Sequence, residues 1–412
     1  MEDTVNSQKK TLAACYIGYI VQAISINVPP VLFIIFQEDF GITFEQLGRL
    51  VLITFLVQML VDVVMAKLIA KTGYRTPSVV AHILAAIGFG MLALAPNLFA
   101  GRVYSGLLLA ACIYAVGSGL IEVLISPIVQ GLSFEEKGPA MSLLHSFYCW
   151  GQLGAVLIST LLLLILGREH WQWIMAIWML VPLINVVLFW SAPLPKVEAG
   201  EEMGGLRRLF KSKLFWIAAL IMVASGASEL AMSQWASLFA QKGLQLNKTL
   251  GDLAGPCFFA LLMGIGRMLY GIKGAKLNIK NILTICGLLC IVCYLTVVFS
   301  PWPILSLLAC GVCGLSVSLM WPGTLVIAAD ALPGAGTALF ALMAVGGDIG
   351  CSAGPWLTGF VSDAASKSQW LLDKTGMEAE QVALRAGLIA AIVFPVLLVI
   401  LVRRLGRKRK ET

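Results

Sequence analysis

Four acidic residues stand inside long apolar stretches of this chain: Asp62, Glu122, Glu229 and Asp348. A carboxylate in the hydrocarbon of a bilayer costs about 2.5–3.5 kcal/mol on insertion scales, so such residues are usually kept for a function. Burial favours the protonated form of a carboxyl group, which can then bind and release a proton near neutral pH. These positions therefore predict proton transfer or ion pairing within a membrane.

The strongest candidate for proton coupling is Glu122, in the segment Gly117-Ser-Gly-Leu-Ile-Glu-Val-Leu-Ile-Ser-Pro127. Its glycines allow another helix to approach closely, and Pro127 can free a backbone carbonyl one turn away from the carboxylate. His145 titrates near physiological pH and could exchange a proton with Glu122 if their helices pair antiparallel. The alternatives are a structural hydrogen bond for Glu122 and a packing role for His145.

Amide, carboxylate and indole groups in the same spans predict contacts with a polar solute. Glu229 begins such a group in the segment Glu229-Leu-Ala-Met-Ser-Gln-Trp235. Together these side chains offer donors, acceptors and an apolar stacking face for a hydroxyl-rich ligand. The predicted solute contacts are Gln22, Asn27, Glu122, Trp150, Gln152, Glu229, Gln234, Trp235 and Trp321.

The remaining charged candidates are interpreted as gating or structural ion pairs. Asp62 precedes three basic residues towards the cytoplasmic end of its span, and Asp348 lies between glycines that indicate close helix packing. The predicted set is Asp62, Lys67, Lys71, Arg75, Arg267 and Asp348.

Composition indicates an all-α membrane protein. Hydrophobic residues make up 59% of the 412 residues and charged residues 12%, about half the charged share of soluble domains. A membrane helix needs about 20 apolar residues, and the alternation expected of barrel strands is missing. Residues 1–10 are polar and no obvious small-residue cleavage site follows, so the first span is expected to stay in the protein. The twelve predicted spans are 11–36, 46–70, 78–95, 103–131, 140–167, 171–191, 214–240, 252–272, 281–300, 303–330, 335–362 and 385–402.

Basic residues predict the orientation. Most of the 29 lysines and arginines fall in segments on one side of the predicted membrane, including the tail Arg403–Lys410. Because cytoplasmic segments are rich in Lys and Arg, we expect both termini in the cytoplasm and a multi-pass protein of the plasma (inner) membrane. The tail is expected to meet anionic lipid. The positive charge is attributed to topology, and nucleic-acid binding is disfavoured.

Two cysteine pairs, Cys290/Cys293 and Cys310/Cys313, have the spacing of a four-cysteine zinc site. Both lie in apolar spans without charged neighbours, where Cys packs as a small hydrophobic residue. The sequence therefore favours packing over a metal. A phosphate-binding Gly-x-x-x-x-Gly-Lys-Ser/Thr run is missing, and no nucleophile–base pair has persuasive context. We expect no metal, no cofactor and no enzymatic activity.

The charged segment 193–213 predicts a cytoplasmic linker between an N-terminal six-helix bundle (1–192) and a C-terminal one (214–412). Its part Leu206–Lys213 could form a short amphipathic helix on the membrane surface. The bundles share motifs: Gly119-Leu120 with Pro127 recurs as Gly314-Leu315 with Pro322, and Gly151-Gln-Leu-Gly154 recurs as Gly347-Asp-Ile-Gly350. These repeats predict two pseudo-symmetric bundles with a solute site between them near the midplane.

The segment Ala66-Lys-Leu-Ile-Ala-Lys-Thr-Gly-Tyr-Arg75 resembles the Gly-x-Leu-Ala-Asp-Arg-x-Gly-Arg-Lys signature of the major facilitator superfamily, and the resemblance covers nearly the whole chain. Leu68, Lys71, Gly73 and Arg75 match the signature. Ala66 and Ala70 replace its first glycine and its aspartate, which implies a weaker charge relay that Asp62 partly compensates.

Two further segments resemble the fucose permease and glucose/mannose permease branch of that superfamily. Gly119-Leu-Ile-Glu122 with Pro127 is similar to Gly-Leu/Phe-x-Glu…Asn-Pro. Gly226-x-x-Glu229…Trp235 is similar to Gly-x-Glu-x-x-x-x-Trp, with one residue of slippage. The resemblance implies that Glu122 is a protonatable coupling residue and that Glu229 and Trp235 lie at a sugar cavity lined by helices one, four, seven and ten.

The chain departs from this branch in two places. Fucose permease pairs its helix-four glutamate with an aspartate in helix one, but Asn27-Val-Pro-Pro30 has no acid, and Ser126 replaces the asparagine before proline. Glu122 could therefore couple alone, His145 or Glu229 could take the second role, or transport could be uncoupled.

These observations predict a monomeric secondary active transporter, with proton-coupled symport of a sugar or similar small polar solute by alternating access as the leading hypothesis. The alternative is proton-driven efflux of hydrophobic or cationic compounds, since exporters of this fold often share acidic midplane residues. A receptor without flux is disfavoured because the chain shows no appended soluble domain.

Overall fold

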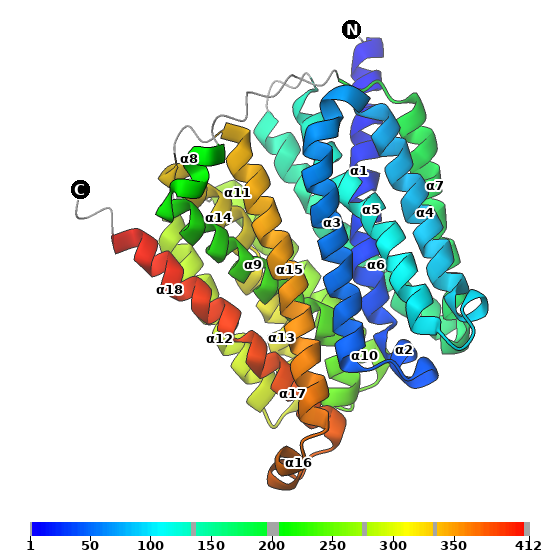
Figure 1. The fold of residues 1–412 in the computed structure, drawn as a ribbon, viewed down its shortest axis with the longest axis vertical. Helices are drawn as coiled ribbons and strands as arrows, with labels where there is room; N and C mark the ends of the chain where they lie inside the picture. The colour runs from blue at the N-terminus through cyan, green and yellow to red at the C-terminus, as the bar shows by residue number, and fades with distance from the viewer. Residues whose placement is uncertain (1, 133–136, 196–205, 274–277, 333–335, 408–412) are drawn as a thin grey trace. The chain divides into compact units, whose positions relative to one another are not determined.

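The computed structural model describes residues 2–132, 137–195, 206–273, 278–332 and 336–407, and every regular element in them is a helix (Figure 1). Eleven of the described helical segments are long and apolar enough to cross a membrane, and α15 (Gly336–Ser366) corresponds to the remaining predicted span, 335–362. The predicted all-α, twelve-helix membrane architecture is confirmed. Residues 196–205 of the predicted linker and the end of the basic tail lie outside the described residues.

The chain forms two compact units. Unit 1 comprises residues 1–42 and 53–200, and unit 2 comprises residues 43–52 and 201–412. The helices that contribute to unit 1 are α1 (Glu2–Val31), α2 (Phe33–Phe40), α3 (Phe44–Thr72, with its first turns in unit 2), α4 (Arg75–Leu98), α5 (Val103–Gln130), α6 (Lys137–Leu166), η1 (Arg168–His170) and α7 (Trp171–Ser191).

Unit 2 contains shorter and more interrupted helices. They are α8 (Leu206–Lys211), α9 (Lys213–Leu238), the π-helices η3 (Phe239–Gly243) and η4 (Leu253–Cys257), α10 (Lys248–Asp252), α11 (Phe258–Lys273), α12 (Ile279–Phe299), α13 (Pro303–Val317), α14 (Met320–Ala331), α15, α16 (Gln369–Thr375), α17 (Ala379–Ala391) and α18 (Val393–Arg407).

Helix ends follow local sequence signals. The left-handed conformation of Gly73 (φ 68°) stops α3, and its amide donates to the carbonyl of Ile69. Glycine adopts this conformation without a Cβ clash. The predicted span 11–36 is interrupted after Pro29 and Pro30, because proline has no backbone N–H to donate the hydrogen bonds that continue a helix. The predicted amphipathic segment forms α8.

One pair of repeated glycines occupies equivalent places in the two units. Gly119 of α5 contacts α3 at Gln58, and Gly314 of α13 contacts α11 at Phe259. Gly151 of α6 contacts α1, and Gly350 of α15, which the repeat aligns with Gly154, contacts α9. In each unit the first and fifth membrane segments therefore meet at a glycine, and so do the second and fourth. Small residues permit such close backbone approach in membranes.

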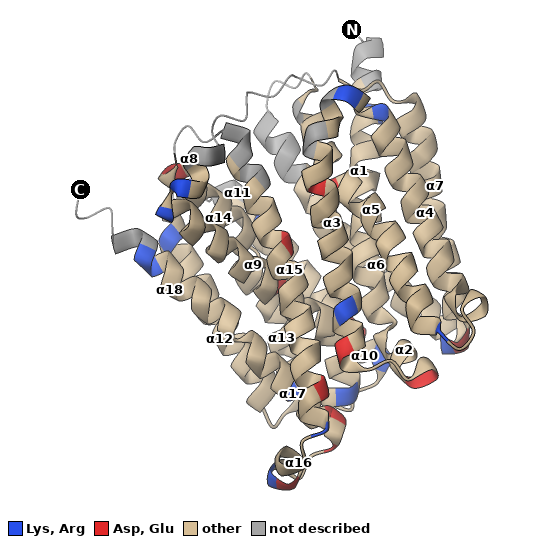
Figure 2. Cartoon of the chain, in the orientation of Figure 1, with Lys and Arg blue, Asp and Glu red and all other residues tan. Residues whose placement is uncertain are grey.

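Charged residues lie mostly towards the ends of the helices of each unit, while the central stretches carry few of them (Figure 2). The charged residues that remain inside the spans therefore stand out, and they include the acidic residues singled out from the sequence.

Candidate functional site

Glu122 lies at the centre of a polar cluster in unit 1. Gln22 of α1 donates a hydrogen bond from Nε2 to Glu122 Oε2 at 2.9 Å, and Gln58 of α3 donates from Nε2 to the same oxygen. Two amides from two different helices thus hold one carboxylate of α5. Both amides are buried, so their donors have little access to competing water.

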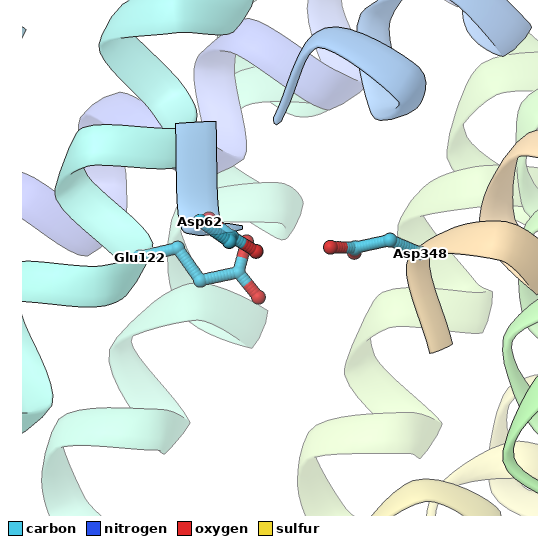
Figure 3. A group of neighbouring side chains, drawn as sticks. All are labelled: Asp62, Glu122 and Asp348. Carbon is cyan, nitrogen blue, oxygen red and sulfur yellow. The ribbon is translucent and has the colours of Figure 1, made fainter. Parts of the chain in front are cut away.

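The carboxylate of Asp62 lies beside that of Glu122. Their oxygens come within 4.8 Å, and Figure 3 shows the two side chains close together. Gln58 and Asp62 are one turn apart on α3, so one face of this helix brings both groups to Glu122. Two negative charges at this distance repel by about 3–4 kcal/mol at an effective dielectric of about 20, and the pair therefore favours holding one proton.

The glycines around Glu122 determine which helices it meets. A Cβ at Gly117 would run into the backbone of Ala81 and Ala85 on α4, and a Cβ at Gly119 would stand 3.0 Å from the carbonyl oxygen of Gln58. The α5 sequence can therefore lie against α4 and α3, and the contact at Gly119 is one turn from the carboxylate. The sequence predicted close approach here but not the partner helices.

His145 reaches α5 indirectly. Its ring lies 5.5 Å from the ring of Tyr19, and the Tyr19 hydroxyl is 2.9 Å from Ser126 Oγ, one turn beyond Glu122. His145 itself is exposed. The structure thus places Tyr19 between His145 and α5, a residue that the sequence reasoning did not single out.

The other predicted solute contacts of unit 1 differ in their surroundings. Asn27 is buried, and its side chain donates back to the Ala23 carbonyl at 2.9 Å. Gln152 is buried, and its Oε1 has no hydrogen-bond partner among the described residues. Trp150, two residues earlier on α6, is 44% exposed. Of the three, Gln152 offers a free acceptor.

Arg75, a predicted ion-pair residue, caps a helix instead. Its guanidinium donates to the Trp190 carbonyl and, at 2.9 Å, to the Ala192 carbonyl at the end of α7. Lys71 is exposed in the last turn of α3, and the side chain of Lys67 lies outside the described residues. Asp62 is described beside Glu122, whereas the sequence grouped it with these basic residues.

In unit 2, Glu229 and Arg267 form an ion pair. Arg267 Nη2 of α11 lies 3.5 Å from Glu229 Oε2 of α9, and the two side chains are 22% and 10% exposed. Arg267 Nε also donates to the Ser318 carbonyl at 3.3 Å, where the helix is interrupted between α13 and α14. One guanidinium therefore joins the carboxylate to an interrupted helix.

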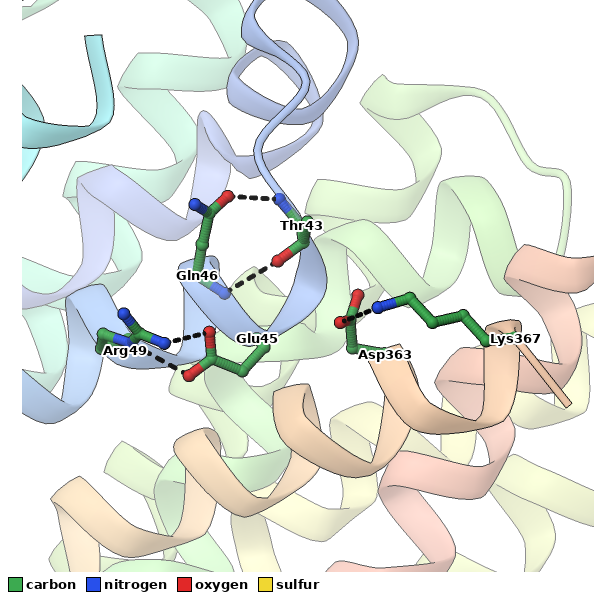
Figure 4. Close-up of polar contacts among 6 residues, drawn as sticks. All are labelled: Thr43, Glu45, Gln46, Arg49, Asp363 and Lys367. Carbon is green, nitrogen blue, oxygen red and sulfur yellow. Dashed lines mark hydrogen bonds and ion pairs between the residues drawn. The ribbon is translucent and has the colours of Figure 1, made fainter. Parts of the chain in front are cut away.

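Two other ion pairs of unit 2 lie at exposed helix ends. Glu45 pairs with Arg49 at 2.6 Å, and Asp363 pairs with Lys367 at 2.9 Å (Figure 4). Thr43 and Gln46 exchange reciprocal hydrogen bonds at the start of α3, which satisfies amides that the helix leaves unpaired. Exposed pairs contribute little to stability, so these contacts differ in kind from Glu229–Arg267.

Trp235, predicted as a solute contact, lies inside unit 2. It is fully buried, its indole N–H donates to the Pro355 carbonyl at 3.1 Å, and its ring lies 6.2 Å from that of Phe44. Gln234 is buried in the same helix. Trp321 packs against Gly347 of α15. Asp348, the next residue, is buried in α15.

The cysteines of α12 and α13 meet inside unit 2. Cys290 Sγ lies 3.8 Å from Cys313 Sγ, and the Cys310 thiol contacts Met232 Sδ at 3.2 Å. All four motif cysteines are buried, and they are free thiols. Their contacts are those of small side chains packed between helices.

Two further polar features escaped the sequence reasoning. Gln58 is a polar residue in an apolar span one turn before Asp62, and this spacing could have revealed it. His82 of α4 and Asn185 of α7 form a buried network: Asn185 Nδ2 lies 2.8 Å from His82 Nε2 and donates to the Ala14 carbonyl at 3.0 Å. Their partners lie on three helices, so no local spacing indicates them.

A family model described as Major Facilitator Superfamily matches residues 15–355. The chain belongs to the major facilitator superfamily. This membership confirms the resemblance found in the sequence. Proteins of this superfamily are transporters, so the chain is a membrane transporter and not an enzyme.

Solved structures of the superfamily have the same fold. A bacterial homologue of the human lysosomal transporter Spinster, inward-facing and unoccupied, is similar with a TM-score of 0.79 at 15% identity over 97% of each chain. The nucleoside transporter NupG is similar with a TM-score of 0.75 at 14% identity, over 97% of this chain and 99% of that one. The E. coli fucose:proton symporter FucP is similar with a TM-score of 0.63 at 17% identity, over 96% of this chain and 98% of that one. No curated relative matches the sequence significantly.

Proposed function

We propose that this transporter carries a sugar or a similar small polar solute together with protons, with Glu122 as the coupling residue. The observation that supports this most directly is the Glu122 carboxylate held by two buried amides, Gln22 and Gln58, next to the carboxylate of Asp62. Asp62 takes the place of the second acid that the sequence lacks in helix one.

The carboxylate pair gives the coupling a physical basis. With one proton, the pair carries a single negative charge that the amides stabilise; without it, the two charges repel in a membrane interior. A second proton would neutralise the pair. Because solute binding next to the pair changes the cost of each charge state, binding of solute and binding of a proton become linked.

The polar groups of unit 1 suit a hydroxyl-rich solute. Buried amides on three helices supply both donors and acceptors: Gln22, Gln58 and Gln152. The free Gln152 Oε1 can accept from a hydroxyl group. The similar structures include a fucose:proton symporter, a D-xylose-proton symporter and a nucleoside transporter.

We propose the organisation predicted from the sequence. The N-terminal bundle (1–192) and the C-terminal bundle (214–412), joined by the linker 193–213, would alternate in access to the two sides of the membrane, as is general for secondary transporters with internal repeats. The transporter would act as a monomer in the plasma membrane, with both termini in the cytoplasm and its basic tail near anionic lipid.

Purified protein in proteoliposomes tests the coupling. With an inward proton gradient, the wild type is expected to accumulate a solute selected by thermal-shift screening of sugars, sugar acids and nucleosides. Glu122→Gln is expected to lose accumulation but to keep counterflow exchange, because the carrier still binds solute. Glu45→Gln, at an exposed helix-end ion pair, is the matched control and should accumulate normally. Equal, gradient-independent uptake by wild type and Glu122→Gln would overturn the proposal.

A further inference from the structure

Arg385 is a half-buried arginine of α17, inside the membrane segment Ala379–Arg404. We propose that it binds the phosphate of an anionic phospholipid where α17 packs against the end of α12 in unit 2. This lipid site goes beyond the proposed transport function, and its test is independent of the solute and of proton coupling.

One donor of the guanidinium caps α12. Arg385 Nη1 donates to the carbonyl of Val298, the last residue but one of this helix. A helix leaves its last carbonyls unpaired, and its C-terminus favours a positive charge. The contact holds the arginine side chain at the end of α12.

The remaining donors of Arg385 have no acceptor among the described residues. A guanidinium carries five N–H groups, and the Val298 carbonyl accepts from one of its nitrogens. Nε is buried without a partner, while the side chain as a whole stays partly exposed. The guanidinium therefore has donors left for a ligand from outside the chain.

Within the described parts of the chain, no acid forms an ion pair with Arg385. α12 and α18 contain neither Asp nor Glu. Residues three and four positions away on a helix share one face. At these positions around Arg385 the sequence has the uncharged residues Gln381, Val382, Leu388 and Ile389.

The acids at the start of α17 have partners of their own. Glu380 lies 3.3 Å from Lys242, and Glu378 accepts a hydrogen bond from Gln245 at 3.1 Å. Arginine stays protonated in proteins, and an unpaired charge in an apolar span is unfavourable. Arg385 is therefore a cation whose charge the described structure leaves to be balanced by an anion.

Exposed aromatic residues mark the membrane interface at this end of α12. Phe299, the last residue of α12, is 65% exposed, and Trp302, just before α13, is 67% exposed. Tryptophan is enriched at the level of the lipid headgroups. Arg385 lies about 9 Å along α17 from its first residue, and an arginine side chain can extend its charged end towards that level. We therefore expect the guanidinium at the depth of the lipid phosphates.

A phospholipid fits this site better than a soluble anion. Phosphate oxygens accept two parallel N–H bonds from a guanidinium. The acyl chains can cover Ile304 and Leu305, exposed apolar residues in the first turn of α13, whereas a soluble anion would gain only a surface ion pair of small value. A zwitterionic headgroup brings its own ammonium group, so an anionic lipid balances the Arg385 charge more completely.

Thermal-shift titrations of the full-length protein in detergent test the inference. The probes are phosphatidylglycerol, phosphatidylethanolamine with the same acyl chains, glycerol 3-phosphate and inorganic phosphate. Phosphatidylglycerol is expected to raise the melting temperature of the wild type more than phosphatidylethanolamine does. The two soluble phosphates should leave the melting temperature unchanged, because they lack acyl chains.

Variants assign the effect to Arg385. Arg385→Gln should weaken phosphatidylglycerol binding about fivefold, the effect of one basic residue at an anionic surface. Arg385→Lys, which keeps the charge but loses the fork, should weaken it less, and it carries the test if Arg385→Gln folds poorly. Arg102→Gln, at an exposed arginine before α5, is the matched control and should bind like the wild type. The basic tail is the same in all four proteins, so lipid bound there contributes equally.

Each shift is measured against the lipid-free melting temperature of the same variant. If Arg385 only caps α12, Arg385→Gln will melt earlier without lipid and keep the full shift with phosphatidylglycerol, which would overturn the lipid site. Equal losses in Arg385→Gln and Arg102→Gln would also overturn it, as would equal binding of the two lipids. Stabilisation by the soluble phosphates that depends on Arg385 would replace the lipid with a free anion.

Discussion

Gly119 of α5 lies against the backbone of Gln58 in α3. A Cβ at Gly119 would stand 3.0 Å from the Gln58 carbonyl oxygen and 3.1 Å from its Cα. Glu122 is one turn further along α5, where the side chain of Gln58 donates to it. The close approach of two backbones therefore fixes the place at which the amide meets the carboxylate.

Gly119→Ala is expected to separate α3 from α5 by a few tenths of an ångström and to weaken the Gln58–Glu122 hydrogen bond. Overpacking typically costs about 1–3 kcal/mol, so the melting temperature should fall and proton-driven uptake should drop several-fold. Gly154→Ala in α6 is the control, because nothing lies within 4 Å of the added Cβ. Equal melting temperatures and uptake rates in the two variants would contradict the role of this contact.

Asp62→Asn removes the negative charge beside Glu122 while keeping the size of the side chain. Without that repulsion the remaining carboxylate gives up its proton more readily, so the pH of half-maximal uptake should move to lower pH. At 1.36 kcal/mol per unit, a repulsion of about 3–4 kcal/mol corresponds to a shift of about two to three pH units. Initial uptake rates measured across pH 5–8 check this. Asp363→Asn, at an exposed ion pair, should not shift the profile. An unchanged pH profile in Asp62→Asn would show that Asp62 does not influence the protonation of Glu122.

Asn185→Ala is expected to destabilise unit 1 by about 1–3 kcal/mol, because it leaves buried His82 Nε2 without its donor. Thermal unfolding in detergent measures the loss, and uptake per folded molecule should change little. Replacing both partners, His82→Phe with Asn185→Leu, should recover part of the stability, since no buried polar group is then stranded. Asn97→Ala at an exposed position of α4 serves as the control. A double variant less stable than Asn185→Ala would argue against this account.

Two Lys–Asp pairs with the same helical spacing are expected to differ in their effect on stability. Lys248 lies 3.0 Å from Asp252, which is fully buried, whereas Lys367 pairs with Asp363 at the surface. Lys248→Met leaves a buried charge without this partner and should cost about 3–5 kcal/mol. Lys367→Met should cost about 0–1 kcal/mol. Chemical or thermal unfolding of both variants measures the loss of stability. Equal losses of unfolding free energy would show that burial does not distinguish the two pairs.

The spans and the superfamily could be predicted because length, apolar content and the Lys71–Arg75 turn are local properties of the sequence. Glu122 was found for the same reason: a carboxylate among glycines is conspicuous in an apolar run. Its partners were harder. Gln22 was assigned to the solute and Asp62 to a basic cluster, since spacing within one helix says which face a residue takes but not which helix faces it.

Trp235 is a residue whose tertiary contacts could not be predicted from the sequence. An indole one to two turns beyond a buried carboxylate has the composition of a binding site, and the resemblance to sugar permeases implied the same. The structure uses its N–H for the carbonyl of Pro355, which belongs to a helix more than a hundred residues away. Which backbone carbonyl a buried indole N–H meets is decided by tertiary packing that no local sequence pattern encodes.

The equivalent glycine contacts of α5 and α13 mean that a closely packed position in one unit has a structural counterpart in the other. Gly119 corresponds to Gly314, so the effect of a substitution in one half can be compared with that of the same substitution in the other half of one protein. Each unit of the duplicated fold therefore serves as a reference for the other. Effects common to both substitutions belong to the shared helix packing, and effects seen in one unit alone belong to residues specific to that unit.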